Sequence, residues 1–336
     1  MKVGLDALTL KAVSLDPLEL LQQTRAHGLE GLHFSARLLQ GCDDAYVDRL
    51  SEEAEAGGLY LELAGAGVNP GRNGRSVTEV VAEWKPLFPL ARRLKAPILN
   101  TCFGLLKERT LSAPTLAEQI DLTIEVLREL GLIAADFDLM ITMELHVDLT
   151  SLELVSIIEK VDSEHVGVNL DTANALGLLE DPVDAARALA PFVHTTHFKD
   201  TCIYPTEEGY NWQGGAPLGR GLVDLPAVVE ILYQANPNVH LNIEDSGGFI
   251  PIPMYDEAFL ESFTDLTPTR MARFVRHLWR GEQQVRAGLH PRPEESKELD
   301  WAAIIPARLQ YNVDYARRLR DETVARLENA GQCDSG

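Results

Sequence analysis

The chain has 336 residues, 45% of them hydrophobic and 24% charged, so it holds ample apolar material for a globular core. Its formal net charge of −21 argues against DNA, RNA or an anionic membrane as the main partner, because those partners require Lys and Arg to displace counterions. A small-molecule substrate fits this charge better, and the length allows one large α/β barrel with an extension or two ordinary domains.

The first residues and the cysteines bear on localisation. Residues 1–6 carry an acid, Asp6, where a signal peptide needs an unbroken apolar core, and no apolar run approaches the length that spans a bilayer. The four cysteines stand far apart, without the close pairs of a zinc ribbon or a redox motif. We therefore expect a cytoplasmic protein with reduced thiols.

Strand-like and helix-like segments alternate from the first residues, which is typical of βα units that build a parallel sheet. Strands are predicted at about 2–8, 29–34, 59–64, 96–100, 139–144, 166–171, 193–197 and 239–244. Helices are predicted at about 16–27, 44–56, 76–94, 115–132, 151–161, 182–189 and 225–235. A (β/α)8 TIM barrel takes about 250 residues. The pattern therefore predicts such a barrel as a catalytic domain over residues 1–249.

Residues 250–336 do not repeat the βα unit and are predicted to form a helical extension. Helices are expected at about 268–286 and 306–329, joined by a polar, proline-containing link. In the second helix, apolar residues recur at helical spacing, so one face should be buried. These residues are Leu309, Val313, Ala316, Leu319 and Leu327. The buried face packs either on the barrel or on another subunit, and we expect a homo-oligomer.

Four polar side chains close the last four predicted barrel strands. They are Glu144, Asp171, His197 and Glu244. The carboxyl ends of barrel strands meet at one face, where carboxylates would repel one another unless a cation lay among them. Three carboxylates and one imidazole suit Mn²⁺ best, with Mg²⁺, Co²⁺ or Zn²⁺ as alternatives. An ion held there would polarise a substrate carbonyl and make the adjacent C–H more acidic.

The order Glu, Asp, His, Glu on strands five to eight resembles the sugar phosphate isomerase/epimerase superfamily of xylose isomerase-like TIM barrels. The stretch Gly219-Arg220-Gly221-Leu222-Val223-Asp224 is similar to the Gly-x-Gly-x-x-Asp turn of that superfamily. The resemblance covers about residues 1–250. It implies that Glu144 and Glu244 exchange a proton with a carbon of the substrate, while Asp171 and His197 act as ligands only.

The sequence departs from the ketose epimerases of that superfamily at two places. Leu145 and His146 follow Glu144 where those epimerases carry an Asn-Arg pair shortly after, and Asn174 replaces a substrate-binding His. His146 lies two residues beyond Glu144, so both side chains point to one side of a continuing strand. We expect His146 to act either as a separate general base or as a structural His that bonds the loop or a neighbouring carboxylate.

Three further side chains are candidates for substrate contacts. Lys199 lies two residues beyond His197 and points either toward a substrate oxygen or into solvent at the rim. Trp212, in the predicted loop 202–218, either stacks on a sugar ring or an aglycone or packs within the loop. Asn174 stands at the position of the epimerase substrate-binding His.

These observations predict a divalent-metal-dependent isomerase or epimerase acting on a sugar or keto-sugar. The alternative is a lyase that uses the same carbon-acid chemistry, since superfamily relatives include inosose and dehydroshikimate dehydratases and C-glycoside deglycosidases. The deglycosidase alternative would add a small accessory subunit and thus a hetero-oligomer. Endonuclease IV shares the barrel, but it has more His ligands and a basic face, which this acidic chain does not match. A barrel that only binds a sugar would leave the glutamate pair without a role.

Overall fold

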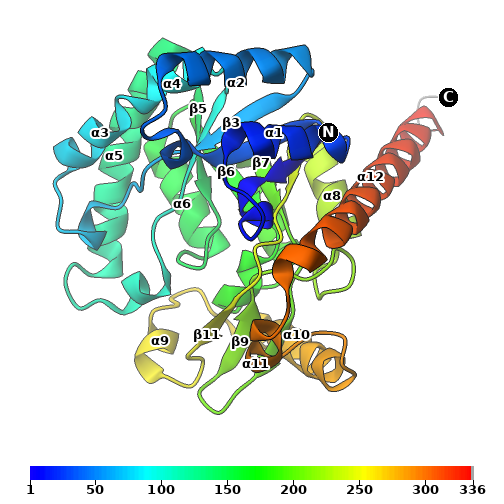
Figure 1. Cartoon of the computed structure of the whole chain (residues 1–336). Coiled ribbons are helices and arrows are strands. Elements are labelled where there is room, and N and C mark those ends of the chain that lie inside the picture. The colour runs from blue at the N-terminus through cyan, green and yellow to red at the C-terminus, as the bar shows by residue number, and fades with distance from the viewer. Residues whose placement is uncertain (334–336) are drawn as a thin grey trace.

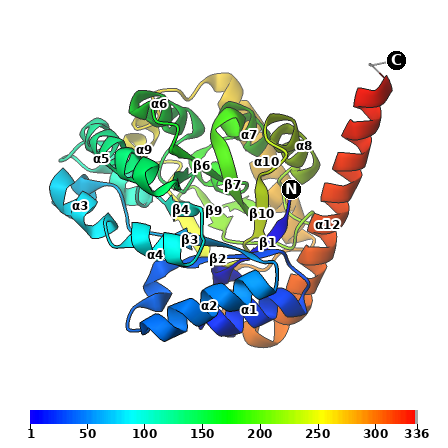
Figure 2. The same cartoon turned by 90° about the horizontal axis from the view of Figure 1, so that it is seen from above.

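The computed structural model describes residues 1–333 and shows a closed barrel of eight parallel strands in the order β1-β10-β7-β6-β5-β4-β3-β2. Figure 2 shows the strands surrounded by helices. The barrel strands are β1 Val3–Asp6, β2 Gly31–Ser35, β3 Tyr60–Ala64, β4 Ile98–Thr101, β5 Met140–Glu144, β6 Val166–Asp171, β7 Val193–Phe198 and β10 His240–Ile243. The predicted TIM barrel is confirmed, with every predicted strand present.

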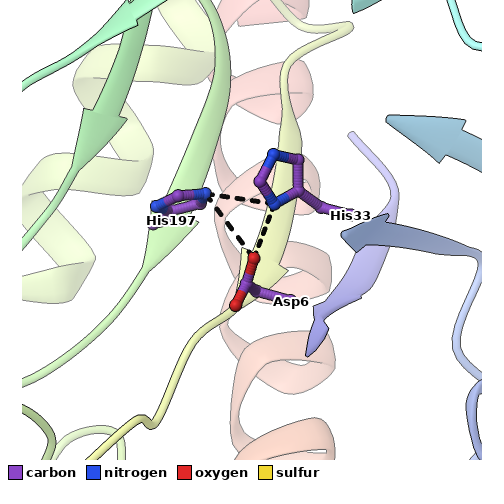
Figure 3. A group of neighbouring side chains, drawn as sticks. All are labelled: Asp6, His33 and His197. Atoms are coloured by element: carbon purple, nitrogen blue, oxygen red, sulfur yellow. Dashed lines mark hydrogen bonds and ion pairs between the residues drawn. The ribbon is translucent and has the colours of Figure 1, made fainter. Parts of the chain in front are cut away.

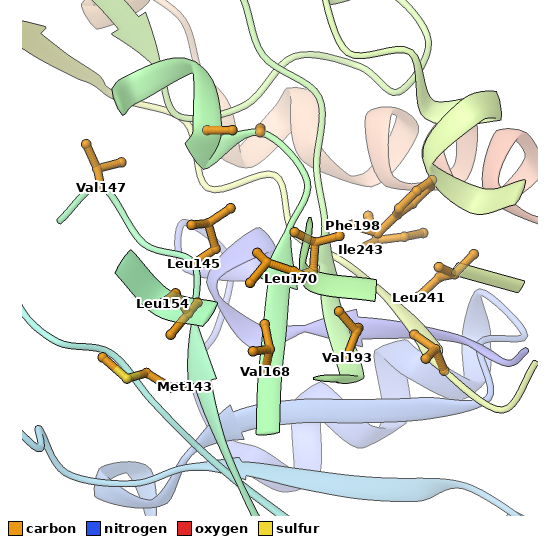
Figure 4. Close-up of a cluster of buried hydrophobic side chains, with 14 of the residues drawn as sticks. Met143, Leu145, Val147, Leu154, Val168, Leu170, Val193, Phe198, Leu241 and Ile243 are labelled. Carbon is orange, nitrogen blue, oxygen red and sulfur yellow. The ribbon is translucent and has the colours of Figure 1, made fainter. Parts of the chain in front are cut away.

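The two faces of the barrel strands differ in chemistry. Side chains alternate along a strand, so apolar residues such as Met143, Val168 and Leu170 pack outward beneath the helices (Figure 4). The alternate positions carry polar residues that bond to one another inside the barrel, including Thr142 Oγ1 to Asn100 Oδ1 of the neighbouring strand at 3.1 Å. These polar side chains can form hydrogen bonds to charged groups at the mouth of the barrel.

The helices that follow the strands cover the outside of the barrel. They are α1 Pro17–Ala26, α2 Asp44–Ala56, α3 Val77–Trp84, α4 Leu87–Arg93, α5 Leu116–Phe137, α6 Ser151–Val161, α7 Pro182–Leu189 and α8 Leu225–Ala235. The single helix predicted over 76–94 was wrong, because Pro86 separates α3 from α4. A proline has no N–H to donate to the carbonyl four residues earlier, so the first helix ends there.

A second sheet lies outside the barrel, where the sequence predicted only a loop. It joins β8 Ile203–Pro205, β9 Tyr210–Gln213 and β11 Phe249–Ile252 in the order β11-β9-β8. Figure 1 shows β9 and β11 at one end of the barrel, next to α9 Glu257–Glu261, α10 Pro268–Arg286 and α11 Pro293–Lys297. Trp212 pairs with Ile250 across this sheet, so Trp212 belongs to a strand rather than to a loop.

The last helix, α12 Trp301–Cys333, begins before the predicted start at Pro306. Asp300 caps it by accepting the N–H of Ala303, and Pro306 lies inside the helix. The buried positions Leu309, Val313, Ala316 and Leu319 pack toward α8, β10 and β1, while Leu327 is half-buried. Figures 1 and 2 both show the far end of α12 projecting away from the barrel. Within residues 1–333, no helix combines the length and apolar character needed to cross a membrane.

Candidate metal centre

The four predicted ligands converge at the carboxyl ends of the barrel strands. Glu144 and Asp171 are the last residues of β5 and β6, His197 lies next to the end of β7, and Glu244 follows β10 directly. One ligand atom from each of the four residues lies within 4.8 Å of the other three, and all four side chains are buried. We call these four residues the quartet. They come together because parallel strands of a closed barrel end at one mouth.

Backbone and amide groups hold the first two carboxylates in place. Asn100, from β4, donates from Nδ2 to Glu144 Oε2 at 3.3 Å. Asp171 Oδ1 accepts the N–H groups of Ala173 and Asn174 at 2.9 and 3.1 Å. Only Oδ2 of Asp171 therefore turns toward the other members of the quartet.

Two cationic groups balance the carboxylates. His197 Nδ1 lies 3.2 Å from Glu144 Oε1 and 3.1 Å from Glu244 Oε2. Lys199 Nζ lies 2.8 Å from both Asp171 Oδ2 and Glu244 Oε1. Burial lowers the pKa of Lys199, but the charges of Asp171 and Glu244 outweigh it, and the pKa is raised. Lys199 is only 4% exposed, so the alternative of a solvated lysine at the rim was wrong.

The pKa values of the three carboxylates of the quartet are shifted in different directions. Burial would raise the pKa of Glu144, but the charge and hydrogen bond of His197 outweigh burial and lower it. For Asp171, burial dominates over the attraction of Lys199, and the pKa is raised. Burial would also raise the pKa of Glu244, but Lys199 and His197 outweigh burial and lower it. The ionised form is therefore favoured for both Glu144 and Glu244.

The residues present fit a divalent ion. Asp171 Oδ2 and His197 Nδ1 are buried and form no hydrogen bond of acceptable geometry within the described residues, although both have charged neighbours. Ligand atoms left without hydrogen bonds and directed at a common point are what a metal centre requires. Three oxygen ligands and one imidazole nitrogen suit hard to intermediate divalent ions.

A cavity of about 360 Å³ opens onto the quartet and brings together the residues predicted to contact substrate. Its lining includes His146, Asn174, Lys199 and Trp212 together with Glu144, His197 and Glu244. Trp212 is buried and donates from Nε1 to the carbonyl of Ala173 at 3.2 Å. Asn174 donates from Nδ2 to the carbonyl of Leu145 at 3.0 Å, which leaves its Oδ1 without a partner among the described residues.

His146 lies beside an acid that the sequence did not single out. Its Nδ1 is 3.5 Å from Oδ2 of the buried Asp148. Burial lowers the pKa of His146, but the neighbouring carboxylate of Asp148 outweighs burial and raises the pKa to about 9. This raised pKa disfavours a neutral general base, one of the two roles predicted for His146, whereas the contact with a neighbouring carboxylate matches the other, structural role.

Other residues of the centre escaped the sequence reasoning. Asp6, His33 and Asn100 lie on β1, β2 and β4, and Asp6 and His33 are each a single polar residue between apolar neighbours. Such polar residues can be recognised in the sequence, but the sequence does not show which of them will lie next to the quartet. The Gly219–Asp224 turn has a clear structural role, since Gly219 N and Gly221 N donate to Asp200 Oδ2 at 3.0 and 2.8 Å.

Fold and site together define a (β/α)8 barrel with a carboxylate and imidazole centre at the strand C-termini. Residues 21–258 match the family described as Xylose isomerase-like TIM barrel. The chain belongs to this family.

Several known proteins are similar to this chain in sequence or in fold. The chain is 25% identical over 237 residues to 3-oxo-isoapionate decarboxylase of Pectobacterium atrosepticum, which covers 67% of this chain and 76% of that protein. Among solved structures, D-psicose 3-epimerase with D-tagatose from Clostridium cellulolyticum H10 is 16% identical with a TM-score of 0.65, covering 95% of this chain and 99% of the epimerase. A xylose isomerase-like TIM barrel protein from Mycobacterium smegmatis in complex with magnesium is 18% identical with a TM-score of 0.58, covering 84% of this chain and 97% of that protein.

Proposed function

We propose that this protein is a divalent-metal-dependent isomerase or epimerase that acts on a sugar or keto-sugar. The observation that carries the proposal is the convergence of four ligand atoms from Glu144, Asp171, His197 and Glu244 within 4.8 Å at the barrel mouth. An ion held there would polarise a bound carbonyl and acidify the adjacent C–H. Mn²⁺ is our proposed ion, with Mg²⁺, Co²⁺ or Zn²⁺ as alternatives.

The chain's own groups account for the proton transfers. Glu144 and Glu244 reach the centre from β5 and from the end of β10, and in this proposal each removes or returns a proton at the carbon beside the bound carbonyl. Lys199 holds positive charge beside Asp171 and Glu244, where it favours negative charge developing on the substrate. Trp212 offers an aromatic surface, and Oδ1 of Asn174 can accept a hydrogen bond from a substrate hydroxyl.

The size of the cavity supports a small substrate. Small-molecule sites range from about 300 to 1,000 Å³. At about 360 Å³ the cavity suits one sugar ring or its open-chain form better than a sugar bearing a large aglycone. This favours a free sugar over the 3-oxo-glucoside of a deglycosidase. Homo-oligomerisation, an accessory subunit and a cytoplasmic location remain predictions.

The second candidate function is a lyase. It is supported by the relative named as a decarboxylase of a 3-oxo acid. It is also supported by His146, which lies beside Asp148 and could protonate either a departing oxygen or the carbanion that remains after loss of carbon dioxide. Both candidate functions use the same activated carbon, so they differ in what happens after the proton or the carboxyl group has left.

Solvent deuterium exchange separates the candidates. The purified protein would be incubated in D2O with keto-sugars, 3-oxo sugar acids and 3-oxo-glucosides, with added Mn²⁺ or with chelator, and the products followed by NMR and mass spectrometry. Metal-dependent exchange with an isomeric product supports the isomerase, and release of carbon dioxide, water or an aglycone supports the lyase. Glu244→Gln should be inactive, whereas Glu52→Gln, at an exposed position of α2, should behave as wild type. Turnover that persists undiminished in chelator would contradict the proposal.

A further inference from the structure

Two buried residues lie behind His197, on the side away from the quartet. Asp6 ends β1, His33 lies on the neighbouring strand β2, and the two residues are direct partners in the register of these strands. Their side chains are 3% and 2% exposed. Figure 3 shows His197 reaching toward both of them from β7. The barrel closure brings the three residues together, because β1 pairs with β10, which in turn pairs with β7.

The contacts fix where the protons lie. Asp6 Oδ1 accepts the N–H of Leu8 at 2.8 Å, so Oδ2 is the oxygen that faces the imidazoles. Asp6 Oδ2 and His33 Nδ1 are 2.5 Å apart, which requires a proton between them. His33 therefore donates from Nδ1. This tautomer leaves Nε2 of His33, which has no partner among the described residues, as a bare lone pair rather than a buried N–H.

His197 has one nitrogen in each environment. Its Nδ1 lies among the quartet carboxylates, while its Nε2 lies 3.3 Å from His33 Nδ1 and 3.7 Å from Asp6 Oδ2. An imidazole that ligates a metal through one nitrogen keeps its proton on the other. With an ion on Nδ1, the proton stays on Nε2, where it faces the negative charge of Asp6 Oδ2. Without an ion, His197 is cationic and Nδ1 also carries a proton, which the ion replaces among the carboxylates of Glu144 and Glu244.

We propose that Asp6 and His33 are a positioning pair that sets the tautomer and ring orientation of His197 and thereby strengthens divalent-ion binding by the quartet. Asp6 supplies the charge, and His33 holds the carboxylate of Asp6 in place through Nδ1. This role rests on the proposed function, since it concerns the same metal centre. It extends that centre to β1 and β2, from which no ligand of the quartet comes.

Metal affinity tests the pair without relying on turnover. Mn²⁺ binding would be measured by calorimetric titration of wild type, Asp6→Asn and His33→Phe, and loss of such a supporting partner raises the Kd by about 10-fold to 100-fold. The matched control is Glu62→Gln. Glu62 is the register partner of His33 on β3 and so controls for the loss of a nearby buried charge. It is also a buried carboxylate paired to an imidazole, His240 Nδ1 at 2.7 Å, but it bonds Thr195 and Asn242 rather than a quartet member. The Kd of Glu62→Gln for Mn²⁺ should stay near the wild-type value.

A second measurement reports the tautomer directly. Nitrogen-15 NMR of labelled imidazoles, with Zn²⁺ as a diamagnetic probe and His197→Gln for assignment, should show a protonated Nε2 on His197 in wild type and a mixed population in Asp6→Asn. An Nδ1–H tautomer in wild type, unchanged Mn²⁺ affinity in both variants, or equal weakening in Glu62→Gln would overturn the positioning role. A second bound ion that is lost with Asp6 or His33 would also overturn it. Failure of wild type to bind any Mn²⁺ would overturn the metal centre itself, and this role with it.

Discussion

Replacement of Lys199 by methionine tests the charge balance of the centre. Lys199 Nζ lies 2.8 Å from one oxygen of Asp171 and 2.8 Å from one oxygen of Glu244, and the lysine is 4% exposed. Methionine keeps much of the apolar stem and removes the ammonium. Two buried carboxylates would then lose their nearest cation, so we expect Lys199→Met to destabilise the metal-free protein strongly.

The magnitude follows from burial. Removing one partner of a buried ion pair costs about 3–5 kcal/mol, because the remaining charge is left uncompensated. A surface pair of the same chemistry provides the control. Lys95 Nζ lies 2.7 Å from Glu55 Oε2, with side chains 61% and 65% exposed. Such exposed pairs contribute about 0–1 kcal/mol, so Lys95→Met should change the free energy of unfolding very little.

Metal should reverse part of the effect. A divalent ion and the Lys199 ammonium compete for the same carboxylates, so the quartet without this lysine should bind Mn²⁺ more tightly. An ion at 100 times its Kd stabilises the folded state by about 2.7 kcal/mol, and tighter binding at the same concentration adds to that. Mn²⁺ should therefore raise the free energy of unfolding more in Lys199→Met than in wild type.

Urea unfolding in chelator and in Mn²⁺, followed by circular dichroism, measures both effects for wild type, Lys199→Met and Lys95→Met. If metal-free Lys199→Met unfolds at the wild-type urea concentration, then Lys199 does not neutralise the carboxylates and the charge argument is wrong. If Mn²⁺ stabilises both proteins equally, then the lysine and the ion do not compete.

Three further predictions follow from single residues. His146 is the candidate acid of the lyase, so His146→Ala should abolish lyase turnover while leaving Mn²⁺ affinity unchanged, and retained activity would reduce His146 to a structural role. Arg308→Ala, which removes the α12 partner 2.5 Å from the buried Asp245, should lower the free energy of unfolding by about 3–5 kcal/mol, whereas Arg326→Ala, at an exposed pair, should cost under about 1 kcal/mol. Burial raises the pKa of Glu180 from 4.5 to about 7, so its contribution to stability is present below pH 4.5 and is lost as pH rises through 7. The stability of wild type relative to Glu180→Gln should thus fall by about 3 kcal/mol between pH 4 and pH 8, and a pH-independent difference in urea unfolding would contradict this.

The sequence was sufficient to predict those features that depend on residues close together in the chain. The apolar runs that end in Glu144, Asp171, His197 and Glu244 predicted both the last four barrel strands and the common position of these side chains. This works because side-chain alternation and the parallel arrangement of strands are fixed by short-range geometry. Local cues were misjudged at two places: Pro86 separates two helices, and the cap at Asp300 starts α12 ahead of Pro306.

Tertiary structure alone decided the contacts between distant segments. The pairing of β9 with β11 joins Trp212 to Ile250, and it turns the predicted loop into one wall of the cavity. Closure of β1 against β10 places Asp6 and His33 behind His197, although these residues are isolated polar positions in the sequence.

The amino-acid order by itself thus determined the barrel, its strand ends and the chemistry of the quartet. The tertiary structure decided which charges balance that quartet, with Lys199 among the carboxylates and Asp6 at the far side of His197. The physical reason is the distance along the chain over which each effect acts. Strand alternation is set within a few residues, whereas the electrostatic environment of a buried charge depends on every group that folding brings within a few ångströms.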